Sequence, residues 1–369
     1  MRAAEFFGGP ERAIIGQCLH LPQFEFICAA FVRGNPENEF LIRAKEAGLK
    51  TTIIRDNFAG DFRVIRQIRD LIKEHQADLL IGHDYKANFF GRQAVKKLDT
   101  VAIAHFRGYT WENKKVKIYN ALNAWLLRRM PLVLTVSEKS RDILIDMGVQ
   151  SDKIRVVPNA VEKSKMVGPD FVRSINENEP LKMVCAGRLS YEKGYDILLD
   201  ALAQIKSEIP PFIVEIYGHG PEQENLRQQT ERLGLTDCVF WRGFTDDIIS
   251  VLRTSDLLLL PSRTEGMPNV LLEAWAQKLG VVSAAVGGVP EMMQHHNGGW
   301  LVKPDDSADL AVKIKEAVAD RQEIIDRGQR GYRTVTEIYS YEKQEEILDN
   351  IYKQAARAGK LGEDISGQD

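Results

Sequence analysis

The chain has 369 residues, 44% of them hydrophobic and 27% charged, a composition typical of a globular protein with enough length for two domains. The formal net charge is −3, so bulk electrostatics give no reason to expect nucleic acid as a partner. Four cysteines without any C-x-x-C pair predict reduced thiols rather than a disulfide framework.

No apolar run approaches the roughly 18 residues of a membrane span. The first residues, MRAAEFFGGPER, lack the long apolar core of a secretory signal. These observations predict a cytoplasmic protein.

Short apolar runs alternate with segments of helical spacing along the chain. The runs predict strands at 24–32, 51–54, 79–81, 101–104, 132–136, 154–157, 182–186, 212–217, 239–241, 257–260, 281–284 and 300–302. The segments between them predict helices, among them 61–75, 114–130, 195–205, 222–233 and 268–278. This alternation is typical of doubly wound α/β domains with parallel sheets and right-handed crossovers.

The alternation breaks once, in the polar stretch between Asn159 and Pro180. We therefore predict an N-terminal domain over 1–165, a linker over 166–180 and a C-terminal domain over 181–340. Ligands of open parallel sheets bind at the carboxyl ends of the strands, so motifs that directly follow strands are the candidates for function.

The first such motif, G-R-L-S-Y-E-K-G at 187–194, places two cations between a strand end and a helix start. Arg188 offers a planar fork and Lys193 a point charge, and the helix start adds a partial positive charge. This arrangement suits a diphosphate leaving group. A solvated loop that carries both charges by chance is the alternative, and the motif alone does not decide between them.

The second motif, P-S-R-T-E-G-M-P-N-V-L-L-E at 261–273, holds two carboxylates eight positions apart. We expect Glu265 on a loop, Pro268 at the first position of a helix and Glu273 inside that helix. Either carboxylate could accept hydrogen bonds from sugar or ribose hydroxyls. The alternative is a capping role for Glu265 and a surface position for Glu273, although Glu273 lies in an otherwise apolar segment. Two glycine turns, G-H-G-P at 218–221 and G-G-V-P-E at 287–291, also follow strands.

In this order and spacing, the four motifs resemble those of the retaining GT-B glycosyltransferases of family 4. The resemblance implies two facing Rossmann-like domains and a C-terminal helix at 341–358 that crosses back to the N-terminal domain, before a tail at 359–369. It also implies that Arg188 and Lys193 hold the donor diphosphate, that Glu265 contacts the donor sugar and that Glu273 contacts the ribose. Further donor contacts are implied for Gly187, Gly218, Gly220, Gly266, Met267, Pro268, Asn269, Val270, Gly287 and Gly288.

The first half resembles the same family, with departures. The run Gly8-Gly9-Pro10 is similar to its glycine-rich N-terminal loop, but only residues 1–7 are left to form the strand that normally precedes this loop. His83 and Lys86 follow a strand and resemble its histidine-containing loop. After the next strand, alignment of the glycine places Arg107, not His105, where many relatives have histidine. Binding of phosphate or sugar by these side chains and ordinary core roles are equally open.

The resemblance implies transfer of a sugar from a nucleotide-diphosphate donor, a UDP- or GDP-sugar, with retention at the anomeric carbon. The chain contains no D-x-D pair and no cluster with clear metal-ligand spacing, which predicts neither a metal nor a cofactor. The acceptor is expected to be a lipid-linked or growing cell-surface glycan. Basic and aromatic residues mix over 111–130, which predicts either an ordinary amphipathic helix or one that touches an anionic membrane at the inner face of the plasma membrane.

Two other functions share features of the sequence. A nucleotide-sugar 2-epimerase would have the same architecture, but the E-x7-E pair beside the two cations favours transfer. A non-catalytic nucleotide-sugar-binding protein would be expected to lack the cations or Glu265, and this chain keeps them. An NAD-dependent oxidoreductase is disfavoured because no strand is followed by G-x-G-x-x-G with a later acidic residue.

Overall fold

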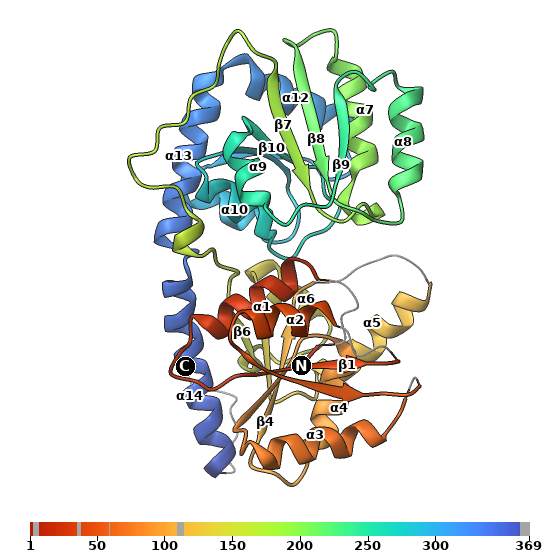
Figure 1. The fold of residues 1–369 in the computed structure, drawn as a ribbon, viewed down its shortest axis with the longest axis vertical. Helices are drawn as coiled ribbons and strands as arrows, with labels where there is room; N and C mark the ends of the chain where they lie inside the picture. The colour runs from red at the N-terminus through yellow and green to blue at the C-terminus, as the bar shows by residue number, and fades with distance from the viewer. Residues whose placement is uncertain (3–6, 35–37, 59, 109–113, 362–369) are drawn as a thin grey trace. The chain divides into compact units, whose positions relative to one another are not determined.

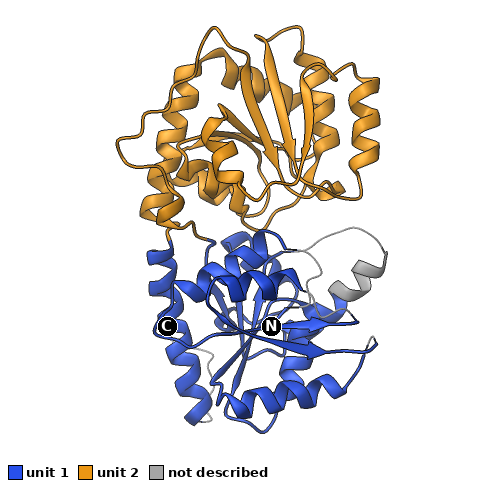
Figure 2. Cartoon of the chain, in the orientation of Figure 1, with its two compact units in different colours: residues 1–108, 113–159, 341–369 blue, residues 109–112, 160–340 orange. Residues whose placement is uncertain are grey.

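The structure is a computed structural model that describes residues 1–2, 7–34, 38–58, 60–108 and 114–361, with the backbone alone for 114–120. The chain forms two compact units (Figure 2). Unit 1 contains residues 1–108, 113–159 and 341–369, and unit 2 contains residues 109–112 and 160–340.

Unit 2 is built on a parallel sheet of six strands, as far as its described residues show, in the order β12-β11-β10-β7-β8-β9 (Figure 1). Its strands are β7 (Leu181–Ala186), β8 (Phe212–Tyr217), β9 (Val239–Gly243), β10 (Leu257–Leu260), β11 (Gly280–Ala284) and β12 (Gly299–Val302). Its helices are α7 (Tyr195–Ile205), α8 (Gln223–Arg232), α9 (Ile248–Thr254), α10 (Asn269–Ala276), α11 (Val289–His296), α12 (Ser307–Ala319) and α13 (Arg321–Glu337). All four leucines of β10 are buried, as expected for a central strand with both faces covered.

The strand order of unit 2 reverses at β7. From β7 the chain continues outward through β8 and β9, and it then returns to the other side of β7 with β10. The loops that follow β7 and β10 therefore begin side by side at the carboxyl edge of the sheet. This is the topological switch point at which doubly wound sheets bind their ligands.

Unit 1 contains the parallel sheet β3-β4-β5-β6 and the parallel pair β1-β2. Its strands are β1 (Ile27–Val32), β2 (Lys50–Arg55), β3 (Leu79–Gly82), β4 (Val101–Phe106), β5 (Leu132–Thr135) and β6 (Ile154–Val156). Its first helices are α1 (Gly9–Leu19), α2 (Glu39–Glu46), α3 (Arg63–Glu74), α4 (Tyr85–Ala94), α5 (Lys114–Leu127) and α6 (Glu138–Asp146). Arg2 exchanges backbone hydrogen bonds with Ala29 and Phe31 of β1, and Met1 does so with Ile81 of β3 and His83, so this segment lies between those strands.

The last helix, α14 (Tyr341–Leu361), belongs to unit 1 although it follows unit 2 in the chain. Its buried face, which includes Leu348, Ile351 and Tyr352, shares a hydrophobic core with Val101 of β4 and Leu132 of β5. The helix that the family resemblance implied to return to the N-terminal domain is therefore present. It begins where predicted, at Tyr341, and ends three residues later than predicted, at Leu361.

The predicted strands all form, with ends that shift by no more than a few residues. The predicted linker over 166–180 lies within unit 2 in the division of the chain. Arg173 anchors it, since this buried guanidinium donates hydrogen bonds to the carbonyls of Leu252, Ser255 and Gln277. The segment thus has a defined place on unit 2, and the domain boundaries themselves stay a prediction.

Candidate active site

Lys193 and Glu265 meet at the switch point of unit 2. Lys193 ends a short 3-10 helix after β7, and Glu265 lies on the loop after β10. The Lys193 Nζ lies 2.7 Å from the Glu265 Oε1, which also accepts a 2.7 Å hydrogen bond from Ser262 Oγ. The lysine side chain is 28% exposed and the glutamate 10%. Lys193 and Glu265, which are 72 positions apart in the sequence, thus join two motifs into one charged site.

Arg188 lies on the same loop as Lys193 and its side chain is exposed to solvent. The Arg188 carbonyl accepts a 2.9 Å hydrogen bond from Ser190 N, which tightens the turn directly after β7. The predicted cationic pair therefore occupies one short loop at the carboxyl edge of the sheet. The contacts of the two side chains with a donor stay a prediction.

Glycines bring neighbouring loops into backbone contact around this site. Gly218 has φ +144°, and a Cβ there would lie 1.9 Å from the carbonyl oxygen of Gly187. A Cβ on Gly220 would lie 2.2 Å from the Leu189 carbonyl oxygen. Side chains at these positions would force apart the loops after β7 and β8.

The loops after β10 and β11 meet in the same way. Gly287 has φ +54°, and a Cβ there would lie 1.9 Å from the carbonyl oxygen of Glu265. Gly288 N donates a 2.7 Å hydrogen bond to the Gly266 carbonyl. The predicted glycines of all four motifs thus gather along one edge of the unit 2 sheet.

Helix α10 carries the rest of the second motif. Pro268 is the N-cap residue, with ψ 117°, and Asn269 is the first helical residue, so the prediction that Pro268 takes the first helical position was wrong. Extended backbone at Pro268 ends the loop before the helix begins. Met267 is buried, Val270 is partly exposed, and Glu273 is half-buried inside the helix. The predicted ribose contact of Glu273 stays a prediction.

Arg263 joins this site, although the motif analysis assigned it no role. Its guanidinium binds both carboxylate oxygens of Asp196, at 2.8 and 2.6 Å, and Asp305 at 2.8 Å, and it stacks 4.0 Å from the centre of the Tyr191 ring. Burial alone would lower the pKa of Arg263, but the hydrogen bonds to Asp196 and Asp305 outweigh it and raise that pKa. Arg263 therefore holds the loop after β10 against the loops after β7 and β12.

In unit 1, Gly8 and Gly9 begin a helix. The sequence predicted a glycine-rich loop, whereas the structure places Gly8 at the N-cap of α1 and Gly9 at its first position, so this prediction was wrong. Gly8 N donates a 2.9 Å hydrogen bond to the buried Glu11, which also pairs with Arg2 at 2.6 Å. The glutamate stabilises the helix start, where donors would otherwise lack partners.

His83 and His105 lie close together in the interior of unit 1. His83 follows β3, and the two ring centroids are 5.2 Å apart. His105 is 2% exposed and lies inside β4 rather than after it, which corrects the predicted loop position. Neither ring nitrogen of His105 has a hydrogen-bond partner among the described residues. Burial, followed by the neighbouring positive charges, holds the pKa of both histidines well below its usual range.

Arg107 directly follows β4 and is partly buried. It donates to Asn159 Oδ1 at 3.0 Å and to Gln17 Oε1 at 3.5 Å. Burial, with a contribution from Arg2, lowers the pKa of Arg107 to about 10, so the side chain stays cationic at neutral pH. Lys86, near the start of α4, pairs instead with Asp56 at 2.8 Å and lies 4.5 Å from the Phe31 ring centre.

The buried His105 and the half-buried His83 predict that acid destabilises unit 1. Their pKa values are lower in the folded than in the unfolded chain. Below about pH 6.5 the unfolded chain therefore binds more protons than the folded chain, and the free energy of unfolding decreases as the pH decreases. Each histidine can contribute up to about 1.4 kcal/mol per pH unit in this range. Urea unfolding at about pH 7.5 and about pH 5.5 measures the loss. His105→Phe should reduce this loss of stability, and an unchanged loss in that variant would contradict the attribution to His105.

Comparison with known proteins identifies the family. Residues 7–165 match the model of Glycosyltransferase Family 4, and residues 169–334 match that of Glycosyl transferases group 1. The chain belongs to the family 4 glycosyltransferases. The resemblance to family 4 is thereby confirmed, together with the GT-B fold class, and retention at the anomeric carbon stays a prediction.

Three known proteins illustrate the similarity of this glycosyltransferase. WcaL of Salmonella typhimurium, which carries a colanic acid biosynthesis name, is 32% identical over 52% of this chain and 48% of its own. The amylovoran biosynthesis glycosyltransferase AmsK of Erwinia amylovora is 29% identical over 61% and 58%. Anabaena HepE, crystallised with UDP-glucose, shares the fold at a TM-score of 0.80 and 22% identity over 95% of this chain and 98% of its own. The match covers 48% of WcaL, so the chain spans about half the length of this curated relative.

The expected absence of a bound metal ion and of a membrane-spanning helix stays a prediction for this glycosyltransferase. Within the described residues, no three or more His, Cys, Asp or Glu side chains gather as they would around a metal ion. In that same part of the chain, no helix has both the length and the hydropathy that crossing a membrane requires.

Proposed function

We propose that this glycosyltransferase moves a sugar from a nucleotide-diphosphate donor to a hydroxyl group of a glycan acceptor. The observation that carries the proposal is the contact between Lys193 and Glu265 at the switch point of unit 2, with Arg188 on the same loop. At this edge of the sheet the cation can bind a diphosphate, and the carboxylate beside it can accept hydrogen bonds from sugar hydroxyls. The names of WcaL and AmsK favour transfer over the epimerase and non-catalytic alternatives.

The principal donor contacts would come from unit 2. Arg188 and Lys193 would meet the diphosphate, Glu265 the sugar hydroxyls and Glu273 the ribose. The glycines allow the donor to approach backbone N–H groups closely, since no Cβ lies in the way. A UDP- or GDP-sugar is the proposed donor class, supported by the UDP-glucose in the HepE crystals.

The proposed reaction retains the anomeric configuration. The bond between the sugar C1 and the β-phosphate oxygen breaks, the acceptor oxygen forms a new bond to C1 on the same face, and the acceptor proton passes to the departing phosphate. Negative charge grows on the diphosphate during this step, so a cation that is already in place lowers the barrier. In this proposal Arg188 and Lys193 provide the charge compensation that a metal ion would otherwise supply.

The proposed acceptor is a lipid-linked or growing cell-surface glycan that contacts unit 1. His83, His105 and Arg107 are its candidate neighbours at the ends of β3 and β4. Because His105 is fully buried, its effect on an acceptor would pass through His83 or Arg107 rather than through direct contact.

A thermal-shift panel of UDP- and GDP-sugars, followed by transfer assays with the best binder, tests the proposal. We expect one nucleotide class to raise the Tm by several degrees at saturating concentration, because only the folded state binds it. Absence of any shift with all nucleotide sugars, or binding without hydrolysis or transfer to any glycan acceptor, would refute the proposed activity.

A further inference from the structure

Unit 1 exposes a patch of large apolar side chains on α4, on α5 and on the segment directly before α3. The patch consists of Phe58, Phe62, Phe89, Leu122 and Trp125. Phe58 is 56% exposed, Phe62 65%, Leu122 55% and Trp125 45%. Exposed apolar residues are normal when scattered, but a contiguous group of this size marks an interaction site.

Contacts join Phe62, Phe89, Leu122 and Trp125 into one continuous surface. Phe89 lines a shallow pocket of about 550 Å³ together with Ala121, Leu122 and Trp125. The Phe62 ring lies 6.5 Å from that of Phe89, measured between ring centres. Helix α4 packs against both α3 and α5, so the three helices present the patch on one rigid support.

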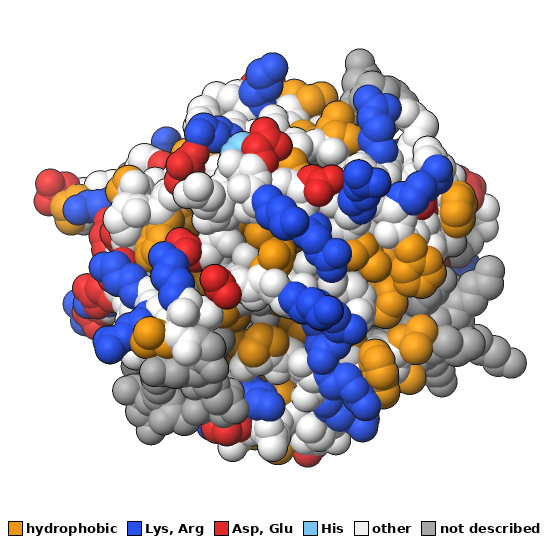
Figure 3. All heavy atoms as spheres, turned by 90° about the horizontal axis from the view of Figure 1, so that it is seen from below, with side chains coloured by type: hydrophobic (Ala, Val, Ile, Leu, Met, Phe, Trp, Pro, Cys, Tyr) orange, Lys and Arg blue, Asp and Glu red, His pale blue; other side chains and the backbone are white. Residues whose placement is uncertain are grey.

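Arginines border the aromatic patch and hold defined positions on it. Arg129 stacks 4.0 Å from the centre of the Trp125 ring, and Arg92 donates a 3.0 Å hydrogen bond to the Arg129 carbonyl. Arg63 lies 5.7 Å from the Phe58 ring centre. Figure 3 displays, on one face of the molecule, a band of Lys and Arg side chains beside apolar ones.

Carboxylates offset only part of this charge. Asp61 pairs with Arg63 at 2.8 Å and is itself buried, and the exposed Asp70 lies 3.8 Å from Arg66. Arg92 and Arg129 donate hydrogen bonds to backbone carbonyls, those of Arg129 and Trp125. Among the described residues named here, the border of the patch therefore carries four arginines against two aspartates.

We propose that the aromatic patch docks on the surface of an anionic lipid bilayer. Tryptophan and phenylalanine rings would enter the headgroup region, while Arg92 and Arg129 would meet lipid phosphates. A second copy of the chain fits less well, because two like-charged borders would face each other across the contact. This inference concerns a surface outside the donor site and does not depend on the proposed reaction.

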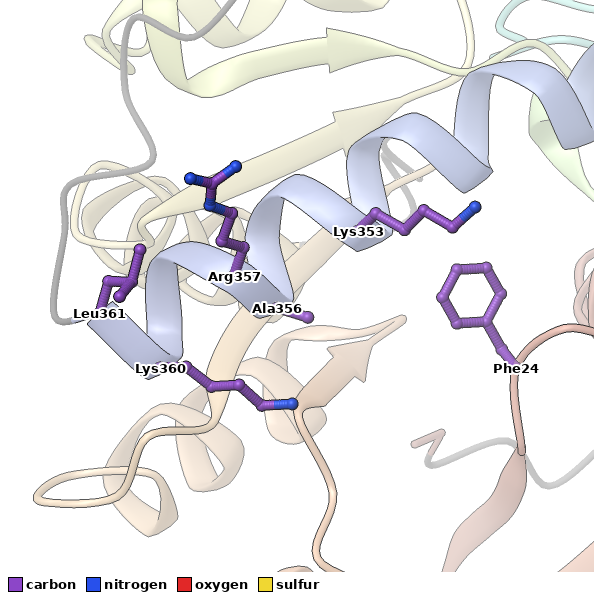
Figure 4. Close-up of a pocket in the computed structure, with 6 residues that line it drawn as sticks. All are labelled: Phe24, Lys353, Ala356, Arg357, Lys360 and Leu361. Atoms are coloured by element: carbon purple, nitrogen blue, oxygen red, sulfur yellow. The ribbon is translucent and has the colours of Figure 1, made fainter.

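A second shallow pocket on unit 1, of about 510 Å³, provides a contrast. It lies beside the last turns of α14, where Phe24 faces the helix (Figure 4), and it is lined by Phe24, Lys353, Ala356, Arg357, Lys360 and Leu361. Carboxylates pair with two of its cations at 2.8 Å, Asp349 with Lys353 and Asp78 with Lys360. With these charges compensated and little aromatic surface, the pocket is the weaker candidate for lipid.

Co-sedimentation with lipid vesicles tests the proposal directly. We expect the full chain to bind vesicles of equal parts phosphatidylglycerol and phosphatidylcholine at least roughly tenfold more tightly than vesicles of phosphatidylcholine alone. Leu122→Asp/Trp125→Asp and Arg92→Glu/Arg129→Glu should each weaken the binding roughly tenfold or more. The milder Trp125→Ala should weaken it less.

Matched variants on unit 2 serve as controls. Val312→Asp introduces a charge at a half-exposed apolar position of α12, and Arg227→Glu/Arg232→Glu reverses two exposed cations of α8; both should bind as the original chain does. Thermal unfolding shows that each variant is folded. Binding without preference for the anionic lipid, equal loss in the controls, or no sedimentation together with a patch-dependent dimer in gel filtration would each overturn the proposal.

Discussion

Alanine in place of Arg188 or Lys193 is expected to lower kcat/KM by roughly a hundredfold or more, about 3 kcal/mol of transition-state stabilisation. Both cations lie on the loop after β7, and Lys193 already lies 2.7 Å from Glu265 at the switch point. Removal of either cation leaves more of the negative charge on the departing diphosphate without compensation. Steady-state transfer assays with the donor identified by thermal shift measure the loss.

Lys193→Ala also leaves Glu265 without its cationic partner, so stability has to be separated from catalysis. The double variant Lys193→Ala/Glu265→Gln removes both charges and should recover thermal stability but not activity. Lys313→Ala, which breaks a surface ion pair with Glu316 on α12, is the matched control and should keep full activity. Full activity in Arg188→Ala or Lys193→Ala would refute the assignment of that cation.

Replacement of Arg173 by Met is expected to lower the free energy of unfolding of unit 2 by about 3 kcal/mol. The Arg173 side chain is 5% exposed and donates to the carbonyls of Leu252, Ser255 and Gln277. Burial lowers the pKa of Arg173 to about 10, so the group stays charged at neutral pH and satisfies three carbonyls at once. Methionine fills part of the volume but leaves those carbonyls without their donor. Urea unfolding monitored by tryptophan fluorescence gives the change.

The neighbouring residue supplies the control for this measurement. Val172 is 80% exposed, so Val172→Ala should change the free energy of unfolding by no more than about 0.5 kcal/mol. If Arg173→Met unfolds at the same urea concentration as Val172→Ala, the arginine does not anchor the segment, and the predicted linker is held by other contacts.

Much of the unit 2 site was predictable because its motifs directly follow strands. An apolar run marks the strand, and the next residues must then lie at the carboxyl edge, so Arg188, Glu265 and the glycine turns could be placed from local sequence. The contact between Lys193 and Glu265 could not, because it depends on β10 lying next to β7. That adjacency belongs to the strand order, which local patterns do not encode.

Other features depended on tertiary contacts that local patterns do not show. Gly8 and Gly9 looked like a loop, but Glu11 caps the helix start and pairs with Arg2, so α1 begins there. His105 looked like a loop residue because β4 continues two residues beyond the predicted strand end. Arg263 stood inside a recognised motif, yet its role depends on Asp196 at the start of α7 and on Asp305 in the loop after β12.

The placement of α14 has a consequence for how the protein is made on the ribosome. Val101 and Leu132 of the unit 1 sheet emerge early in translation, while Leu348 and Tyr352, which cover them, emerge last. Unit 2 is encoded almost entirely by one uninterrupted stretch and can complete itself first. The apolar face of the unit 1 sheet therefore stays uncovered until synthesis of the chain is complete. A stop codon shortly before position 341 would leave that face permanently exposed, so we expect the truncated protein to aggregate.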